Sequence, residues 1–158
     1  MKKFSWLLLI LLCFVATGTQ AGYESDTPVE FELQRLHGDK TRLSEFRQKW
    51  VVINYWATWC APCRKEIPEL SELHLARADI VVLGLAFEDT DIESFDEFLE
   101  EFDVSYPLLL VDVYAPPEPF GAPRVLPTTI IIDPEGYPVK TYLGPVTRDS
   151  IESFIDSQ

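Results

Sequence analysis

Two cysteines stand three residues apart, Cys60 and Cys63, and the 158-residue chain has no other cysteine after residue 21. A disulfide between residues this close in sequence closes a very small loop, so it constrains the unfolded chain little and makes a poor structural staple. A Cys-X-X-Cys pair at the start of a helix is instead suited to thiol-disulfide exchange. In that chemistry one thiolate attacks a disulfide of the partner, and the second thiol resolves the mixed disulfide.

The residues around the pair predict where each sulfur lies. Residues 50–56 (WVVINYW) are nearly all apolar and β-rich, which is typical of a strand buried on both faces. A helix is expected over about 61–77, so Cys60 falls at its N-terminus and Pro62 in its first turn, where the missing N–H is not needed. Unpaired N–H groups and the helix dipole then favour the thiolate of Cys60. We therefore expect Cys60 to attack and Cys63, one turn further along, to resolve.

Two other uses of the cysteine pair stay open at this point. Zinc needs four ligands, and the chain could add only His37 and His74, which lack the usual paired spacing. We therefore expect no metal and no organic cofactor. A purely structural disulfide is the second alternative, and the small loop that it would close argues against it.

Strands and helices alternate along the rest of the chain. The apolar patterns predict an edge strand over 29–35, buried strands over 80–87 and 107–113, a hairpin over 128–133 and 137–143, and amphipathic helices over about 91–102 and from about 147. Pro68 predicts a bend in the helix that follows the cysteines. Buried strands that alternate with helices and end in a hairpin predict a three-layer α/β sandwich around a central mixed sheet.

The N-terminus has the pattern of a secretory signal peptide. Lys2 and Lys3 precede an apolar stretch of residues 4–16. The segment ends in Thr19, Gln20 and Ala21, which places small residues at positions −3 and −1 before the expected cleavage site. The apolar stretch is shorter than the roughly 20 residues that span a bilayer as a helix. We expect residues 1–21 to be a signal peptide, with an uncleaved membrane anchor as the alternative, and residues 22–158 to form one domain.

The excess of acidic residues bears on which kinds of molecule the protein can bind. The whole chain carries 13 basic and 26 acidic side chains, a net charge of −13, and Lys2 and Lys3 are the only charges in residues 1–21. Such a charge argues against nucleic acid or an anionic membrane surface as partner. Residues 88–103 alone hold nine acidic and no basic residues. That segment is either a solvated helix face or a docking patch for a basic partner such as a c-type cytochrome.

Two motifs together resemble the TlpA/ResA-like branch of the thioredoxin family, the exported thiol-disulfide oxidoreductases. They are LSEFRQKWVVINYWATWCAPCRKEIPEL, which contains the cysteine pair, and LPTTIIIDPEGYPV about sixty residues later. The resemblance runs from about Phe31 to Phe154 and implies a thioredoxin-like three-layer α/β/α sandwich. It also implies that Pro127 is a cis proline facing the cysteines, with Leu126 before it, and that this segment binds an extended substrate.

The resemblance further implies roles for two polar positions. Asn54 stands where many thioredoxins have a buried acid, and this branch instead places a Glu three residues after the second cysteine, here Glu66. A carboxylate there could take the proton that Cys63 must lose, or it could only complement the helix dipole. Trp59 is expected to shield the disulfide and to join the docking surface, although packing alone would also explain it.

The sequence departs from the family pattern at two places. Gln48 stands where the family usually has glycine, which we expect to be harmless. The stretch APPEPFGAP, residues 115–123, replaces what is often a short helix, and its four prolines predict a stiff loop without a helix. Arg64 and Lys65, beside the cysteines, are expected to face solvent.

We therefore expect an exported enzyme that reduces disulfides of specific proteins, for instance in cytochrome c maturation or metal-centre assembly. Its partners would be protein thiols and disulfides and a membrane thiol reductase that supplies electrons, and we expect a monomer in the periplasm or another extracytoplasmic compartment, free or tethered by its N-terminal segment. The alternatives are a disulfide-forming oxidase or isomerase, and a non-enzymatic metal-delivery module on the same fold.

Overall fold

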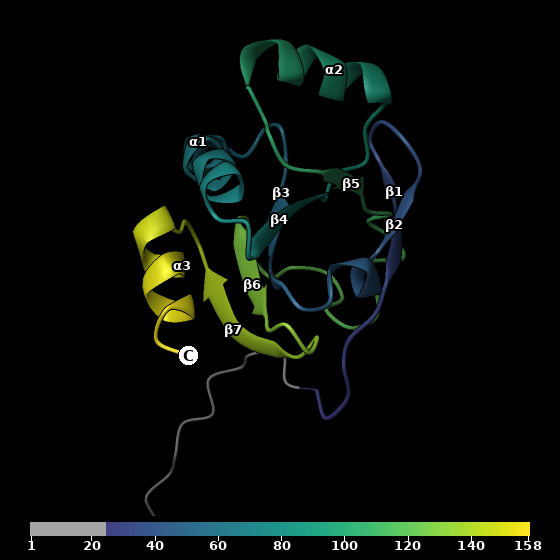
Figure 1. Ribbon diagram of the computed structural model, residues 1–158. Coiled ribbons are helices and arrows are strands. Elements are labelled where there is room, and N and C mark those ends of the chain that lie inside the picture. The colour runs from purple at the N-terminus through teal and green to yellow at the C-terminus, as the bar shows by residue number, and fades with distance from the viewer. Residues whose placement is uncertain (1–24) are drawn as a thin grey trace, which may run out of the picture.

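The computed structural model describes residues 25–158 (Figure 1). The expected signal peptide over residues 1–21 therefore lies outside the described residues. The strands are β1 (Glu32–Arg35), β2 (Lys40–Arg42), β3 (Trp50–Trp56), β4 (Ile80–Ala86), β5 (Leu108–Leu110), β6 (Thr128–Ile132) and β7 (Pro138–Leu143). The helices are the 3-10 helix η1 (Leu43–Phe46) and the α-helices α1 (Ala61–Ala76), α2 (Ile92–Glu101) and α3 (Arg148–Ile155). Among the described residues, no helix is both long and apolar enough to cross a membrane.

The strands form one mixed sheet in the order β2-β1-β5-β4-β3-β6-β7. The three central strands β5, β4 and β3 run parallel, and the strands on either side of them pair antiparallel. All the predicted strands and helices are present with ends shifted by up to three residues. The expectation that the first strand lies at the sheet edge is wrong, because the turn at residues 36–39 returns the chain as β2 on its outer side.

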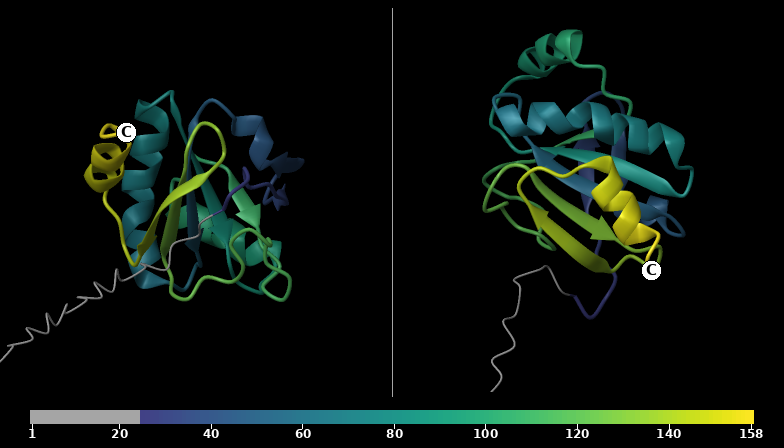
Figure 2. Two further views of the ribbon diagram at one scale, coloured as in Figure 1. Left: turned by 90° about the horizontal axis from the view of Figure 1, so that it is seen from below. Right: turned by 90° about the vertical axis from the view of Figure 1, so that its left-hand side faces the viewer.

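The three α-helices cover one face of the sheet. Residues of α1, α2 and α3 pack with Val52, Trp56 and Val82 in one buried cluster, which also contains Cys60 and Cys63. Figure 2 shows α1 and α3 side by side on this face and η1 on the other side of the sheet. Successive side chains of a strand point in opposite directions, so the buried strands supply apolar side chains to both faces of the sheet.

The second face is covered without an α-helix among the described residues. Leu43 of η1, Val29 and Phe31 of the segment before β1, and Phe120 of the Pro-rich loop pack on Tyr55 and its neighbours in the sheet. The Phe31 and Phe120 rings meet edge to face with centroids 6.3 Å apart. The helix-free loop over residues 115–123 is therefore confirmed, and the expected three-layer sandwich is confirmed with loops and a 3-10 helix as its third layer.

Gln48, at the end of the turn that leads into β3, has a backbone φ of 70°. This left-handed region suits glycine and costs a residue with a side chain roughly 1–2 kcal/mol. The Gln48 N–H donates to the carbonyl of Pro134 at 2.9 Å, so the turn is held against the β6–β7 connection. The turn therefore has the conformation that the family's glycine provides, and the expectation that glutamine is harmless to function there stays a prediction.

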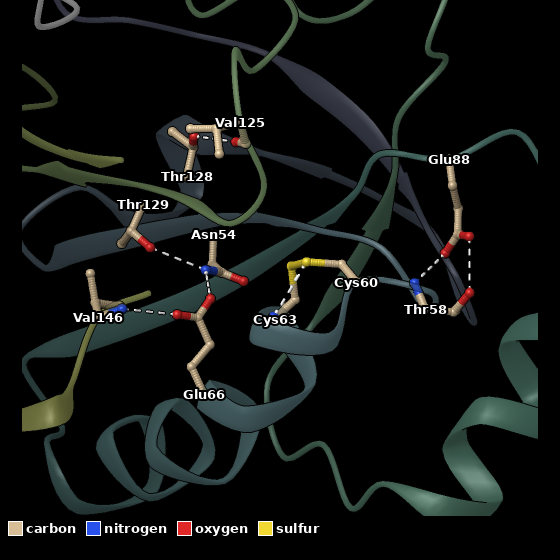
Figure 3. The surroundings of a disulfide bond; sticks show 10 residues. All are labelled: Asn54, Thr58, Cys60, Cys63, Glu66, Glu88, Val125, Thr128, Thr129 and Val146. Atoms are coloured by element: carbon tan, nitrogen blue, oxygen red, sulfur yellow. Dashed lines mark hydrogen bonds between the residues drawn. A yellow bond between two sulfur atoms is a disulfide. The ribbon is translucent and has the colours of Figure 1, made fainter. Parts of the chain in front are cut away.

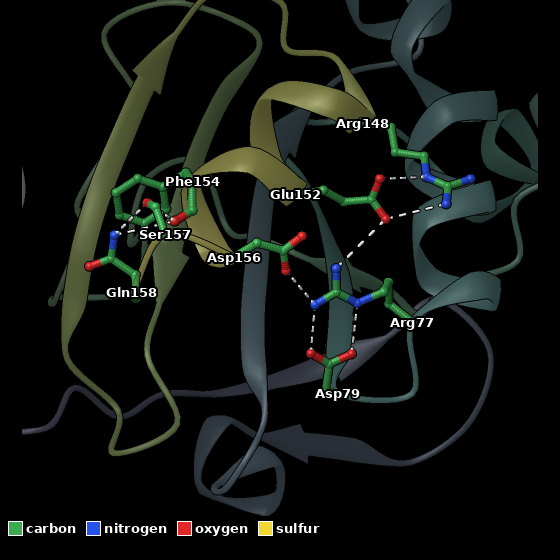
Figure 4. Close-up of polar contacts among 8 residues, drawn as sticks. All are labelled: Arg77, Asp79, Arg148, Glu152, Phe154, Asp156, Ser157 and Gln158. Carbon is green, nitrogen blue, oxygen red and sulfur yellow. Dashed lines mark hydrogen bonds and ion pairs between the residues drawn. The ribbon is translucent and has the colours of Figure 1, made fainter.

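The C-terminal helix is fastened to the end of α1 that lies away from the cysteines (Figure 4). Arg77, directly after α1, donates to Asp79 and to Asp156 at the end of α3. Arg148 at the start of α3 pairs with Glu152 one turn later. These contacts place the C-terminus at the end of the sheet where the strands β3 and β4 begin.

The beginning of the described chain lies at the same end of the sheet. The Val29 N–H donates to the carbonyl of Gly136, in the turn between β6 and β7. The opposite end of the sheet, where β3, β4 and β5 end and β6 begins, carries the cysteine pair, because Cys60 follows the last residue of β3 after a short loop and caps α1.

Candidate active site

Cys60 and Cys63 form a disulfide at the N-terminus of α1 (Figure 3). Cys60 is the N-cap residue of the helix, and a proline stands in the first turn, as the sequence predicts. The Cys60 Sγ accepts a hydrogen bond from the Cys63 N–H at 3.3 Å. The sulfur of Cys60 therefore receives one of the N–H groups that a helix N-terminus leaves unpaired, and this contact favours a thiolate there after reduction.

The two cysteines differ little in burial, but the residue before them is exposed. Cys60 retains 3% of its surface and Cys63 none. Trp59 is 68% exposed. An indole of this size left in water beside a disulfide is a suitable contact for a partner protein. Its expected shielding of the disulfide stays a prediction.

The Leu126–Pro127 peptide bond is cis, as the resemblance implies. Thr128, the next residue, pairs with Tyr55 near the end of β3. The antiparallel course therefore brings Leu126 and Pro127 alongside the residues that lead to the cysteines. Leu126 packs against the cluster that contains Cys60 and Cys63. The structure thus brings the two parts of the predicted site together.

Glu66 lies near the disulfide in a buried hydrogen-bond network (Figure 3). Its side chain is buried, and its carboxylate accepts from the Asn54 Nδ2 at 2.6 Å and from the Val146 N–H at 3.0 Å. Asn54 Nδ2 also donates to the Thr129 Oγ1 at 3.1 Å. The strand β3, the helix α1 and the connection before α3 therefore meet at this carboxyl group, and β6 joins the network through Asn54.

Burial raises the pKa of Glu66 to about 7. The hydrogen bonds from Val146 and Asn54 act in the opposite direction, and the charge of Glu69 adds to the increase. Burial dominates because a carboxylate removed from water loses more solvation free energy than two donors restore. The suggestion that Glu66 only complements the helix dipole does not fit a side chain held this deeply in the protein.

A second carboxylate, which the sequence did not single out, contacts the turn before the cysteines. Glu88, in the connection between β4 and α2, accepts from the Thr58 N–H at 2.7 Å and from the Thr58 Oγ1 at 2.9 Å (Figure 3). Glu88 is one of many acids in residues 88–103, so composition hides it. Its place just after β4 could have indicated this contact, because β3 and β4 are parallel and their C-terminal ends therefore lie side by side. No sequence signal marked the Val146 N–H.

Arg64 is partly exposed, so the expectation that it faces solvent holds in part, but its side chain is also paired. Its guanidinium donates to both carboxylate oxygens of Glu101, at 2.9 and 3.0 Å, and lies 4.8 Å above the centre of the Phe102 ring. The pair connects the first turns of α1 to the end of α2. Lys65 is exposed, as expected.

The described residues contain no group of three or more His, Cys, Asp or Glu side chains placed to hold a metal ion. The chemistry within residues 25–158 that the site supports is the exchange of a disulfide between two sulfurs, with a carboxyl group of pKa about 7 close to them.

Comparison with known proteins gives consistent matches. Residues 25–137 match the AhpC/TSA family. The thiol-disulfide oxidoreductase ResA of Halalkalibacterium halodurans is 30% identical over 168 residues, which cover 98% of this chain and 95% of that protein. The crystal structure of a DsbF homologue from Corynebacterium diphtheriae is 28% identical with a TM-score of 0.74, covering 92% of this chain and 98% of that one. A secreted thiol-disulfide isomerase from Corynebacterium glutamicum is 26% identical with a TM-score of 0.71, covering 89% and 92%.

The residues that match the family include Cys60, Cys63, the helix α1 and the Leu126–Pro127 segment of this chain. The AhpC/TSA match spans well over half of the chain, and the ResA match spans nearly all of it. The chain belongs to the AhpC/TSA family and is a thiol-disulfide oxidoreductase of its ResA-like branch.

Proposed function

We propose that this oxidoreductase acts as a protein disulfide reductase, with Cys60 as the attacking thiol, Cys63 as the resolving thiol and Glu66 as the proton acceptor. The observation that carries the proposal is the disulfide at the start of α1 with the buried carboxyl of Glu66 near it. Cys60 is the cysteine that caps the helix and keeps some exposed surface. Cys63 is fully buried behind it, where the sulfur within its reach is that of Cys60 in the mixed disulfide.

The proposed reaction balances in two steps. The Cys60 thiolate attacks one sulfur of the substrate disulfide, that disulfide breaks, and the departing sulfur takes a proton. Cys63 then loses its proton and attacks the Cys60 sulfur, which releases the second substrate thiol and restores the Cys60–Cys63 disulfide. Two electrons pass to the substrate, and a membrane thiol reductase would return the protein to its reduced form.

Glu66 is suited to accept the proton of Cys63. The two residues are three apart on α1, which places them on the same side of the helix. A carboxyl group with a pKa of about 7 can take a proton from a thiol, whose usual pKa is about 8.5, and can release it again near neutral pH.

The surroundings of Cys60 support the reducing direction. A dithiol becomes a strong oxidant when its thiolate is specially stabilised. Arg64, the nearest cation along the helix, pairs with Glu101, and Glu88 adds a negative charge to the turn before Cys60. The helix N-terminus therefore gives the main support to the thiolate.

Trp59, Leu126 and Pro127 form the proposed contact surface for an extended substrate segment. The substrates would be proteins with a disulfide between nearby cysteines, such as an apocytochrome c or a protein awaiting a metal centre. We also propose that residues 1–21 direct export, either as a cleaved signal peptide or as a tether, and that the enzyme works outside the cytoplasm as a monomer. The relative described as secreted supports this location.

Trapping tests the assignment of roles. Cys63→Ser should accumulate mixed disulfides between Cys60 and substrate proteins, and Cys60→Ser, its matched control, should not, as resolved by non-reducing gels. Trapping by the Cys60→Ser variant instead would reverse the roles. Equilibration of the wild-type pair with glutathione should give a potential of about −200 mV or lower. A value near −120 mV, typical of strong oxidants, would favour a disulfide-forming oxidase.

A further inference from the structure

Glu88 makes two hydrogen bonds to the turn before Cys60 from another segment of the described structure. Its two oxygens accept separately from the N–H and the hydroxyl of Thr58, so both carboxylate oxygens are used (Figure 3). Thr58 stands two residues before Cys60, and the exposed Trp59 lies between them. Both Thr58 and Glu88 are partly buried.

This contact continues the pairing of β3 with β4 beyond the last residues of the two strands. The last backbone bond between them runs from the Phe87 N–H to the Trp56 carbonyl at 2.8 Å. Beyond it the chain after β3 turns toward α1, closed by a bond from the Cys60 N–H to the Ala57 carbonyl at 3.1 Å. The Glu88 carboxylate reaches across this divergence and takes the N–H of Thr58, which would otherwise have no strand to bond.

We propose that Glu88 is a positioning residue for thiol-disulfide exchange. Through Thr58 it holds the turn that presents Trp59 and Cys60, so the Cys60 sulfur keeps one line of approach to the disulfide of the substrate. The inference rests on the proposed function, because it assumes that Cys60 is the attacking sulfur. Glu88 exchanges no proton or electron in either step, and the effect proposed here, beside that of its charge, is on the geometry of Cys60.

Geometry matters here because the attacking sulfur must meet the substrate disulfide in line. A displacement of about 1 Å at a reacting atom can cost on the order of 100-fold in rate. Hydrogen bonds to a carboxylate are shorter and about twice as strong as those between neutral groups, so two of them hold a four-residue turn firmly.

The chain offers a variant that removes the charge of Glu88 and keeps the contact. In Glu88→Gln the amide oxygen can accept from the Thr58 N–H, and the amide nitrogen can donate to the Thr58 hydroxyl, which accepts as readily as it donates. Glu88→Ala removes both bonds. Asp89→Ala is the matched control, because Asp89 is the neighbouring exposed acid and its side chain accepts a long hydrogen bond from the Tyr114 hydroxyl at 3.4 Å, away from Thr58.

The experiment measures the second-order rate constant at which the reduced full-length chain reduces a peptide with an internal disulfide. The pH is raised until the rate no longer increases, so that the attacking thiol is fully ionised in every variant. Glu88→Ala should be about 10-fold slower than wild type, Glu88→Gln should stay within about twofold of it, and Asp89→Ala should match it. Circular dichroism and urea unfolding establish that each variant is folded.

Equal plateau rates for wild type and Glu88→Ala overturn the inference, and so does a Glu88→Gln variant as slow as Glu88→Ala. If Glu88→Ala does not fold, Thr58→Val, which removes one of the two bonds, should be slowed and Thr58→Ser should recover the rate, and equal rates for these two overturn the inference. A wild-type protein that never reduces the peptide refutes the proposed reductase function instead, which separates the two failures.

Discussion

Glu66 is an acidic side chain that the fold removes from water, and its energetic cost has a definite dependence on pH. The pKa of Glu66 is about 7 in the folded protein and about 4.5 in the unfolded chain. A raised pKa means that the folded state binds a proton more tightly than the unfolded state. The stability linked to this proton is present below about pH 4.5 and is lost as the pH rises through 7.

Glu66→Gln should remove this part of the pH dependence, because an amide does not titrate in this range. The unfolding free energy of the oxidised wild-type protein should fall by about 3 kcal/mol relative to the variant as the pH rises from 4.5 to 7.5, which is the shift of about 2.5 units at 1.36 kcal/mol each. Asn54 can adapt to the new amide by rotating its own, since its Oδ1 has no hydrogen-bond partner among the described residues. Urea unfolding at a series of pH values measures the difference.

Glu72→Gln is the matched control for this prediction. Glu72 lies on the same helix, and its side chain is 70% exposed. Its unfolding curves should follow the wild-type pH dependence. If Glu66→Gln also follows the wild type, the pKa of the Glu66 carboxyl is not raised in the folded protein, and its role as a proton acceptor near neutral pH loses its physical basis.

The residues of the candidate site differ in how well the sequence predicted them. Cys60, Cys63 and Pro127 belong to motifs with fixed spacing, so their place in the fold was predictable. Glu66 was identified, but the sequence could not decide between its two roles, because burial depends on the packing of four segments around it. Glu88 was missed because its partner Thr58 is 30 residues away and only the register of β3 with β4 brings the two together.

The elements themselves followed from periodicity, and the errors lie at the connections. Continuous apolar runs predicted β3 and β4, and helical spacing predicted α2. The short strand β2 has three residues, of which only Thr41 is buried, so its sequence carries no strand pattern. Its presence moved β1 away from the sheet edge, which no local pattern of residues 29–35 could reveal.

The turn between η1 and β3 gives a prediction at the scale of an element. Gln48→Gly should raise the unfolding free energy by about 1 kcal/mol, because glycine adopts the observed φ of 70° without the strain of a side chain, and this gain exceeds its entropy cost in the unfolded chain. Urea unfolding at one fixed pH measures the change, and exchange activity should be unaffected.

Lys49→Gly is the matched control in the same turn. Lys49 is the next residue, is also exposed, and is not among the described residues with positive φ. Its substitution should lower the unfolding free energy by about 0.5–1 kcal/mol, since only the entropy cost of glycine remains. If the two variants change stability by the same amount, the backbone at Gln48 is not strained.

The charge of the whole molecule shapes how partners arrive. The net charge is −13, and the acids of residues 88–103 lie in α2 and its connections, joined to the helix of the cysteines through Arg64 and Glu101. A negative surface near the reactive edge raises the local concentration of positively charged partners and repels negative ones, and salt screens both effects.

Two peptides with the same internal disulfide, one flanked by lysines and one by glutamates, should therefore react at different rates. At low salt the lysine peptide should be reduced at least about 10-fold faster, and the rates should converge near 1 M salt, where the screening length falls to about 3 Å. Stopped-flow measurement of both peptides across a salt series checks this. Rates that are equal at low salt would leave the acidic face as a solvated surface without a role in docking.

Both ends of the described chain lie at the end of the sheet opposite the disulfide, where β3 and β4 begin. A molecule attached to a membrane, a bead or a sensor chip through either end would therefore turn Cys60 and Trp59 outward. Neighbouring copies on such a support would stand side by side with their reactive edges facing the solution, so crowding would not hide one disulfide behind another. An immobilised layer of this enzyme should then treat passing proteins as effectively as the same number of molecules in free solution.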